Sequence, residues 1–217
     1  MLVKDYMTRH PLMAAPTMPI VEAQRFMGEN KIRHLPICGD GKRLLGLITE
    51  QSLLVRPGTL GSLNVWEITR FLSNLTVGDV MIKAKDVVTI EQDATIEEAA
   101  RIMVKNRIGC LPVLEEGIVV GIITETDLLA HLTDLLGWPV HGVRVTIRVP
   151  DRIGEFAKIT SAIASQGWGI YAAGGAPTPK QPDYWDAVVK VTDVSKDDLL
   201  AVLEQVEGQE IVDAREV

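Results

Sequence analysis

The pattern of apolar and polar residues along the chain occurs twice. In the second occurrence, a Thr-x-x-Glu capping box at residues 95–98 precedes apolar residues at helical spacing, which predicts a helix ending near residue 106. Two short β-rich runs follow at 110–114 and 118–123, and the Glu-Gly dipeptide between them predicts a hairpin turn. Thr124 and Asp127 then favour the start of a second helix, with Thr124 as its N-cap.

The first part of the chain carries the same pattern. Residues 44–54 and 119–129 are identical at six of eleven positions, and residues 32–37 align with 108–113. One copy, consisting of a strand, a helix, a hairpin and a second helix, is too small to bury both faces of its sheet. We therefore expect the two copies to pack together.

The repeat also sets the expected domain boundaries. The first copy is predicted at residues 1–60 and the second at 77–136. Between them, apolar residues three and four apart predict an amphipathic linker helix over residues 61–76. Trp66 and Phe71 are expected to pack this helix against the two copies.

A different pattern begins after residue 142. Residues 143–149 alternate apolar and polar side chains, which predicts a strand with one solvated face. The following segments predict a helix, two strands, a helix and a last strand at 154–166, 168–174, 184–191, 195–203 and 210–212, with a Gly/Pro-rich loop at 173–182. The order βαββαβ is that of the ferredoxin-like split, so a separate domain is expected at 143–217 and the fold class is α/β (α+β).

Composition and charge exclude several function classes. The formal net charge of −7 and a pI near 5.2 argue against binding nucleic acid. No apolar run approaches the roughly 18 residues needed to span a membrane, and no signal peptide is visible, so a cytoplasmic protein is expected. Cys38 and Cys110 form no CxxC pair and the four histidines are isolated, which predicts no metal site. No catalytic motif is present either, so we expect no enzyme activity and no tightly bound cofactor.

The repeated segment resembles paired CBS domains, the Bateman module, over about residues 1–135. The resemblance is carried by Leu-Pro-Ile at 35–37, Leu-Pro-Val at 111–113 and the Gly-x-x-Thr-x-x-Asp pattern of Gly121, Thr124 and Asp127. It implies two CBS-type βαββα repeats packed as a pair. It also implies that an adenosine compound binds in the cleft between them: AMP, ADP, ATP, S-adenosylmethionine or NAD.

Thr124 and Asp127 are the leading candidates for contacting such a ligand. A carboxylate in the first turn of a helix can accept hydrogen bonds from both ribose hydroxyls, while a Thr hydroxyl and free backbone N–H groups suit a phosphate. The resemblance further implies contacts to the adenine and, through an arginine, to the phosphate from Val88, Thr89, Cys110, Pro112 and Arg107. The alternative is that Thr124 and Asp127 form only a helix cap.

The first copy departs from this pattern because Ser52 occupies the position of Asp127. A hydroxyl cannot accept two ribose hydrogen bonds as an ionised carboxylate does, so a weaker or empty second site is expected. Its candidate residues are Thr49, Ser52, Arg33, His34 and Pro36. Arg33 and His34 offer donors to a phosphate, and the alternative for His34 is a half-buried strand residue.

The last domain resembles the ACT domain, a ferredoxin-like module that senses amino acids and related metabolites. The resemblance is carried by the βαββαβ order and by Asp151, Arg152 and Gly154 after the first strand. It implies an effector site at an interface between two ACT domains, with Gly169 nearby. Ile153 replaces the proline common in the family, and Gly169 stands where many members carry an asparagine. The alternative is a structural, dimerising domain without an effector.

Two CBS-like copies followed by an ACT-like domain resemble the AcuB-type proteins, a family named for acetoin utilisation. The resemblance implies a non-enzymatic, homodimeric regulatory protein. Such a protein binds an adenosine compound, with a second small-metabolite site at the ACT interface, and acts on a separate, unidentified partner. The competing hypothesis is a constitutive dimerisation scaffold that binds no nucleotide.

Overall fold

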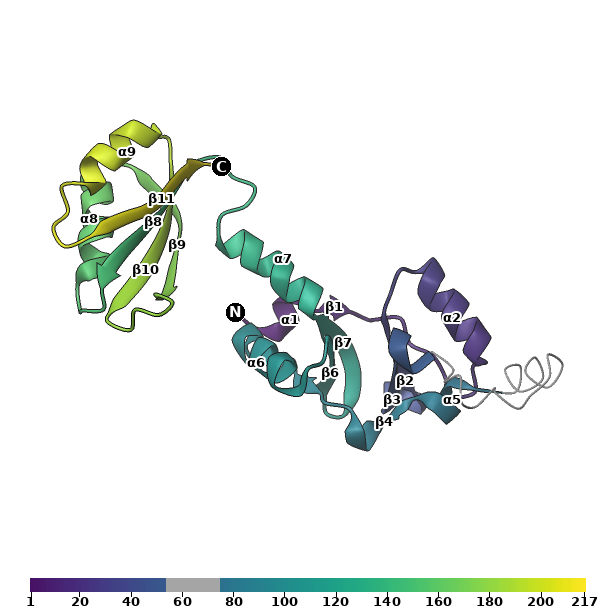
Figure 1. Ribbon diagram of the computed structural model, residues 1–217. Coiled ribbons are helices and arrows are strands. Elements are labelled where there is room, and N and C mark those ends of the chain that lie inside the picture. Colours follow the sequence, from purple (N-terminus) through teal and green to yellow (C-terminus); the bar gives the residue numbers. More distant parts are fainter. Residues whose placement is uncertain (54–74) are drawn as a thin grey trace, which may run out of the picture. The chain divides into compact units, whose positions relative to one another are not determined.

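The computed structural model describes residues 1–53 and 75–217, and the chain divides into two compact units, residues 1–128 and 129–217 (Figure 1). The predicted end of the first copy and most of the predicted linker helix, including Trp66 and Phe71, lie outside the described residues. Residues 75 and 76, expected at the end of that helix, are not helical. No helix in the described part of the chain is long and apolar enough to cross a membrane.

Both copies contain the predicted helix and hairpin, followed by a second helical segment. In the first copy these elements are α2 (Ile20–Glu29), β2 (His34–Cys38), β3 (Leu44–Thr49) and the 3-10 helix η2 (Glu50–Leu53). In the second copy they are α6 (Ile96–Asn106), β6 (Cys110–Glu115), β7 (Ile118–Thr124) and α7 (Glu125–Leu135). Two further 3-10 turns are η1 (Asp40–Lys42) and η3 (Ala84–Asp86).

Local sequence signals explain these boundaries. The Thr95 hydroxyl accepts a hydrogen bond from the Glu98 backbone N–H at 3.1 Å, which confirms the predicted cap of α6. The turn between β6 and β7 places Glu116 and Gly117 at positive φ, as a tight two-residue hairpin requires.

The segment preceding each copy's main helix is exchanged between the copies. The helix α1 (Val3–Tyr6) and strand β1 (Thr8–Arg9) belong to the first copy by sequence, yet β1 pairs with β7 of the second (Figure 1). Reciprocally, α5 (Val77–Val80) leads into β4 (Ile82–Lys83), which pairs with β3 of the first copy. Together with β5 (Ile90–Glu91), this gives two sheets of order β1-β7-β6-β5 and β2-β3-β4. The sequence analysis did not anticipate the exchange.

The exchange also determines which residues form each core. Val3 is completely buried in the core of the second copy, against residues of α6 and β6, and Val77 is completely buried in the core of the first copy. Burial of apolar side chains is the main stabilising contribution to packing, so each copy depends on the other to complete its core.

Two glycines at equivalent positions make the exchange sterically possible. A Cβ on Gly46 would overlap the Ile82 carbonyl oxygen, and a Cβ on Gly121 would overlap the Met7 sulfur. Each glycine therefore lies where an exchanged strand passes close to the hairpin. This close approach explains why the Gly of the repeated Gly-x-x-Thr pattern occurs in both copies.

The second unit contains one four-stranded antiparallel sheet. Its elements are β8 (Val143–Pro150), α8 (Glu155–Ser165), β9 (Gly169–Pro177), β10 (Tyr184–Thr192), α9 (Lys196–Leu203) and β11 (Glu210–Glu216), and the strand order is β11-β8-β10-β9. The alternate residues Val143, Val145, Ile147 and Val149 are buried beneath α8 and α9, which cover one face (Figure 1). The predicted order of strands and helices is present.

Two predicted boundaries in this unit are wrong. The last strand, expected at 210–212, continues to Glu216 as β11. The loop expected at 173–182 starts late, because β9 continues to Pro177 and pairs with β10 along its length. A Cβ on Gly175 would lie 2.6 Å from Cη2 of Trp185, so this glycine makes room for the neighbouring strand's indole. Gly175, which indicated a loop in the sequence, therefore allows close packing inside a sheet.

Candidate functional site

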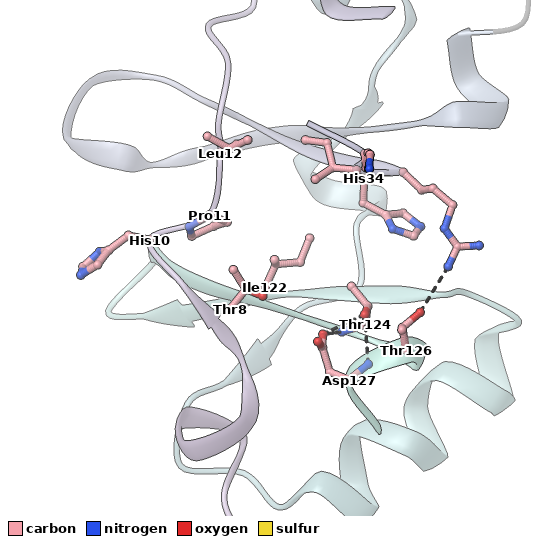
Figure 2. A pocket seen from close by; sticks show the side chains of 12 residues that line it. Thr8, His10, Pro11, Leu12, His34, Ile122, Thr124, Thr126 and Asp127 are labelled. Carbon is pink, nitrogen blue, oxygen red and sulfur yellow. Dashed lines mark hydrogen bonds between the residues drawn. The ribbon is translucent and has the colours of Figure 1, made fainter. Parts of the chain in front are cut away.

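A cavity of about 400 Å³ lies between the two copies, at the start of α7 (Figure 2). The first copy supplies the segment between β1 and α2 and the turn before β2, and the second copy supplies β7 and the first turn of α7. The lining residues are Thr8, His10, Pro11, Leu12, Lys31, Ile32, Arg33, His34, Ile122, Thr124, Thr126 and Asp127. A volume of this size matches the lower part of the range for small-molecule sites.

Thr124 and Asp127 form a reciprocal cap at the start of α7. The Thr124 backbone N–H and its hydroxyl each donate to Asp127 Oδ2 at 2.7 Å, and the Asp127 backbone N–H donates to the Thr124 hydroxyl at 3.3 Å. Two of the donors that a helix start leaves without partners are thereby satisfied. The helix-cap role considered for these residues is therefore present in the structure.

The cap engages only one oxygen of the Asp127 carboxylate. Both bonds end on Oδ2, and Oδ1 accepts no hydrogen bond from the part of the chain that the structure describes. A carboxylate oxygen has two acceptor sites, so Oδ1 can receive donors from a bound molecule while Oδ2 still caps the helix. The cap and a ligand contact are compatible at this residue.

Basic side chains from the first copy lie on the other side of the cavity. Arg33 donates from Nη2 to the Thr126 hydroxyl at 3.4 Å (Figure 2). Arg33 Nη2 is also 3.6 Å from Glu125 Oε1, and these two contacts link the turn before β2 to the first turn of α7. Lys31 lies in the same turn, where its φ of 53° is left-handed. The cavity therefore combines a carboxylate with two cations.

His34 adds a titratable group to the lining. Burial lowers the pKa of His34 below its ordinary value of 6.5, the neighbouring Arg33 lowers it further, and Glu125 and Glu50 partly oppose the shift. The imidazole is therefore neutral near pH 7 and can both donate and accept a hydrogen bond.

At the equivalent place in the first copy, the Ser52 hydroxyl is already used. It donates to the Thr49 carbonyl oxygen at 2.8 Å and accepts from the Thr49 backbone N–H at 2.9 Å. The Ser52 backbone N–H in turn donates to the Thr49 hydroxyl at 3.1 Å. Ser52 therefore has no second oxygen to offer a ligand.

The cavity regroups the residues that the sequence assigned to two sites. It brings Thr124 and Asp127, predicted for one site, together with Arg33 and His34, predicted for the other. The remaining candidates do not line it: Val88, Thr89, Arg107, Cys110, Pro112, Thr49, Ser52 and Pro36. The physical reason is that the turn before β2 of one copy faces the helix start of the other.

Cys110 illustrates where one of those other candidates lies. It is buried with Leu47 and Ile122 where the two sheets meet, and Val87 packs against this group. Burial raises the pKa of the Cys110 thiol to about 12, with a contribution from Glu125, so the thiol stays protonated near neutral pH.

The cavity also contains residues that the sequence analysis missed, among them Thr8, His10, Pro11, Leu12 and Lys31. The repeat held a usable signal for Lys31, because residues 31–34 align with 107–110, where Arg107 had been singled out. No comparable signal marked Thr8 to Leu12, since their position follows from the exchanged strand β1.

In the C-terminal unit, three of the four predicted effector residues lie in the turn after β8: Asp151, Arg152 and Gly154. Gly154 has a φ of 96° and open space around its Cβ position. The fourth residue, Gly169, pairs with Thr192 at the far end of β10. The two places are separated by the length of a nine-residue strand, roughly 26 Å, so one chain does not bring all four together.

A protein family and several solved structures are similar to this chain over the two copies that form the cavity. The CBS domain family matches residues 3–57 and 77–134, which is just over half of the chain. The crystal structure of a putative acetoin utilization protein (AcuB) from Vibrio cholerae is 33% identical with a TM-score of 0.53, covering 63% of this chain and 93% of that one. The CBS domain pair of protein MJ0100, crystallised with 5′-methylthioadenosine and S-adenosyl-L-methionine, is 27% identical with a TM-score of 0.50 and covers 62% and 97%.

Among curated proteins, the uncharacterized protein MJ1225 of Methanocaldococcus jannaschii is 33% identical over 133 residues, which is 60% of this chain. The chain spans only 46% of that relative's length. The family match ends at residue 134, so it does not include the C-terminal sheet. The match to both repeats, together with the paired sheets that the structure shows, establishes that the chain belongs to the CBS-domain family.

Proposed function

We propose that this chain is a non-enzymatic regulatory protein that binds an adenosine compound in the cavity between its two CBS copies and acts on a separate protein. The observation that carries the proposal is the start of α7, where Asp127 caps the helix through Oδ2 and keeps Oδ1 for a ligand. A ribose presents two neighbouring hydroxyls, and an ionised carboxylate oxygen is a strong acceptor for them.

The related CBS pair of protein MJ0100 supports the ligand class, because it was crystallised with two adenosine compounds. In this chain, Ile122, Pro11 and Leu12 supply apolar surface on which an adenine ring can pack, and the basic residues of the turn before β2 lie in the same lining. We place the ribose on Asp127 and Thr124.

The C-terminal unit is proposed to be an ACT domain. Its strand order, with both helices on one face, corresponds to the ferredoxin-like arrangement of that family. A site formed by Asp151, Arg152 and Gly154 of one chain with Gly169 of a second would require a homodimer, because one chain keeps them apart. The similarity to the Vibrio cholerae protein supports membership of the AcuB-type proteins.

The test is thermal unfolding of the full chain with AMP, ADP, ATP, S-adenosylmethionine, 5′-methylthioadenosine and NAD. A ligand at 100 times its Kd stabilises a protein by about 2.7 kcal/mol. We expect at least one compound to raise Tm. Asp127→Ala should lower affinity at least about tenfold, which reduces the stabilisation at the same ligand concentration to about 1.4 kcal/mol or less.

Asp79→Ala is the matched control. Asp79 caps α5 as Asp127 caps α7, because the Thr76 backbone N–H and hydroxyl donate to its Oδ2 at 2.9 and 2.7 Å. Asp79 does not line the cavity, so its loss removes a comparable cap without touching the ligand. If no compound raises Tm, the scaffold hypothesis is correct. If a compound raises Tm and Asp127→Ala responds like Asp79→Ala, the Asp127 cap is only structural and the ligand does not depend on it.

A further inference from the structure

The end of α7 packs against the sheet of the C-terminal unit. Gly137 follows the helix with a φ of 87°, and its backbone N–H donates to the Asp134 carbonyl oxygen at 2.9 Å. The Trp138 N–H donates to the Thr133 carbonyl oxygen at 3.0 Å, which completes a Schellman motif. A Cβ on Gly137 would lie 2.9 Å from Cδ of Lys190, so this motif lies tightly against β10.

Lys190 is a buried cation. It is 3% exposed, and in the part of the chain that the structure describes its one hydrogen bond runs from the ammonium to the Gly137 carbonyl oxygen at 3.1 Å. Directly opposite on β8 is Arg144, a second cation, which pairs with Asp213. Burying a charge without a counter-ion is costly, and like charges opposite each other on paired strands are destabilising. The position of Lys190 therefore costs the sheet stability.

The negative end of the α7 dipole offsets this cost. The carbonyl groups at the end of a helix act together as about half a unit of negative charge, and a cation beside them is stabilising. α7 has no basic residue in its own last turn, where Asp134 adds to the negative charge. Lys190 supplies from the sheet the cation that the helix lacks.

The middle of α7 receives little support from packing. Of its eleven residues, all in the described part of the chain, only His131 is buried, while Leu129 is 61% exposed and Leu132 is 49% exposed. Isolated helices shorter than about 12–15 residues are marginal in water. The stability of α7 therefore depends on its two ends, the Asp127 cap at the start (Figure 2) and Lys190 at the finish.

From these observations we infer that Lys190 is a positioning residue for the cavity: by capping the end of α7, it keeps the helix formed back to the turn that carries Asp127. The boundary between the two compact units falls within α7, after Leu128. Lys190 lies beyond residue 134, where the CBS family match ends, so the C-terminal unit supports a cavity that it does not line.

The regulatory consequence rests on the proposed function. A ligand on Asp127 and the cation at the other end of α7 both favour the formed helix. Each therefore strengthens the effect of the other, because the helix is a single element whose equilibrium both ends bias.

Hydrogen exchange of the full chain, measured by NMR, tests the inference with Lys190→Met, which keeps most of the side-chain length and removes the charge. Amides 135–138 at the end of α7 and amides 129–131, which close its first turn, should both exchange at least about fivefold faster. Amides of β8 and β10 should exchange no faster, because the substitution also removes the repulsion from Arg144. General damage to the fold would accelerate the strands as well.

Two further variants separate the helix cap from other effects. Lys158→Met is the matched control, since Lys158 is an exposed lysine of the same unit that pairs with Glu155 at 2.9 Å, and it should leave α7 unchanged. Asp134→Lys, added to Lys190→Met, places a cation in the last turn of α7 itself. Because Asp134 is exposed, this change should restore about half of the lost protection without repacking the sheet.

The ligand gives a second readout. AMP, or whichever of the six compounds raises Tm, is added to the unaltered chain at 100 times its Kd. Exchange should then slow at least about tenfold at amides 135–138 as well as at 129–131, because a ligand that binds only the formed helix suppresses its opening.

The outcomes distinguish this inference from the proposed function. If Lys190→Met accelerates only amides 135–138, or accelerates the strands as much as α7, Lys190 does not position Asp127 and the inference is wrong. A bound ligand that slows only amides 129–131 would likewise show that the two ends are independent. If none of the six compounds binds, the proposed function fails, while amides 129–131 in Lys190→Met still decide the inference.

Discussion

The two CBS copies cap their last helical segment in the same way, but only one cap leaves an acceptor for a ligand. In the second copy Asp127 uses one of its two carboxylate oxygens for the cap, and in the first copy the single side-chain oxygen of Ser52 makes the cap. The difference shows that capping and ligand binding are separable requirements at this position. The fold requires the cap in both copies, whereas a site requires the second oxygen.

The turns that face these helices differ as well. Lys31 aligns with Arg107, but Arg33 aligns with Gly109 and His34 with Cys110. The turn that lines the Asp127 cavity therefore has two basic side chains and an imidazole, whereas the equivalent turn of the other copy has one basic side chain, Arg107, and no imidazole. The two copies have equivalent backbone at this turn, but the basic side chains and the imidazole are more numerous in one of them.

The largest expected effect concerns the glycines where the exchanged strands pass. At Gly46 an added Cβ would overlap the backbone oxygen of Ile82, which cannot move alone, while at Gly121 the nearest atom is the flexible Met7 side chain and the Thr8 oxygen is 3.1 Å away. Gly46→Ala should lower the free energy of unfolding by about 3 kcal/mol and Gly121→Ala by about 1. Urea denaturation of both variants checks the order, and equal losses would mean that the two passages are equally tight.

Ser52→Asp should partly remove the difference between the copies. A carboxylate at residue 52 can cap the segment as Asp127 does and still offer an oxygen to a ribose, a contact worth about 1.5–3 kcal/mol. Calorimetry should then show a second, weaker site for AMP. A titration of Ser52→Asp that shows one binding event, as in the unaltered chain, would mean that residue 52 does not contact a ribose.

His34 should make the stability of the ligand-free protein depend on pH below neutrality. The pKa of His34 in the folded chain lies below 6.5. As the pH falls, the unfolded chain therefore binds a proton at this residue before the folded chain does. Stability is complete above pH 6.5 and declines as the pH falls through 6.5 towards the folded pKa. His34→Cys, which introduces the residue found at the equivalent position in the other copy, should flatten Tm measured between pH 7.5 and 5.5. An unchanged slope would assign the dependence to other groups.

The smallest expected effect on the free energy of unfolding comes from replacing Lys31 or Arg107, which occupy equivalent positions in the two copies. Both have left-handed backbone conformations, with φ of 53° and 54°, which glycine adopts without steric cost. Lys31→Gly and Arg107→Gly should each raise the free energy of unfolding by about 0.5–1 kcal/mol. Only Lys31→Gly should weaken AMP binding, because only Lys31 lines the Asp127 cavity. Equal AMP affinities of the two variants would exclude a contribution from Lys31.

Much of the secondary structure could be predicted because its signals are local. The cap at Thr95, the turn at Glu116 and Gly117, and the alternation over 143–149 each depend on residues close in sequence. The exchanged strands β1 and β4 are two residues long, too short to show any periodicity. Their pairing depends on partner strands in the other copy, so no local sequence pattern predicts it.

The sequence predicted the two residues at the start of α7 as one group, but it did not predict which residues of the other copy line the cavity with them. Thr124 and Asp127 were found from residue chemistry and spacing, since both lie in one helix turn. Which turn faces them depends on how the two copies pack, and sequence spacing carries no information on that. Arg33 and His34 were therefore recognised as candidates but assigned to the other site.

The exchange of β1 has a consequence for the order in which the protein forms during synthesis. Thr8 pairs with Ile122, so this strand cannot reach its place until more than a hundred further residues have been made. At roughly 5–20 residues per second, translation leaves the segment without its partner strand for on the order of 6–20 s. During that time the Val3 and Met7 side chains lack the core that buries them in the finished protein. The repeat that appears twice in the sequence is thus not a unit that can fold twice in succession.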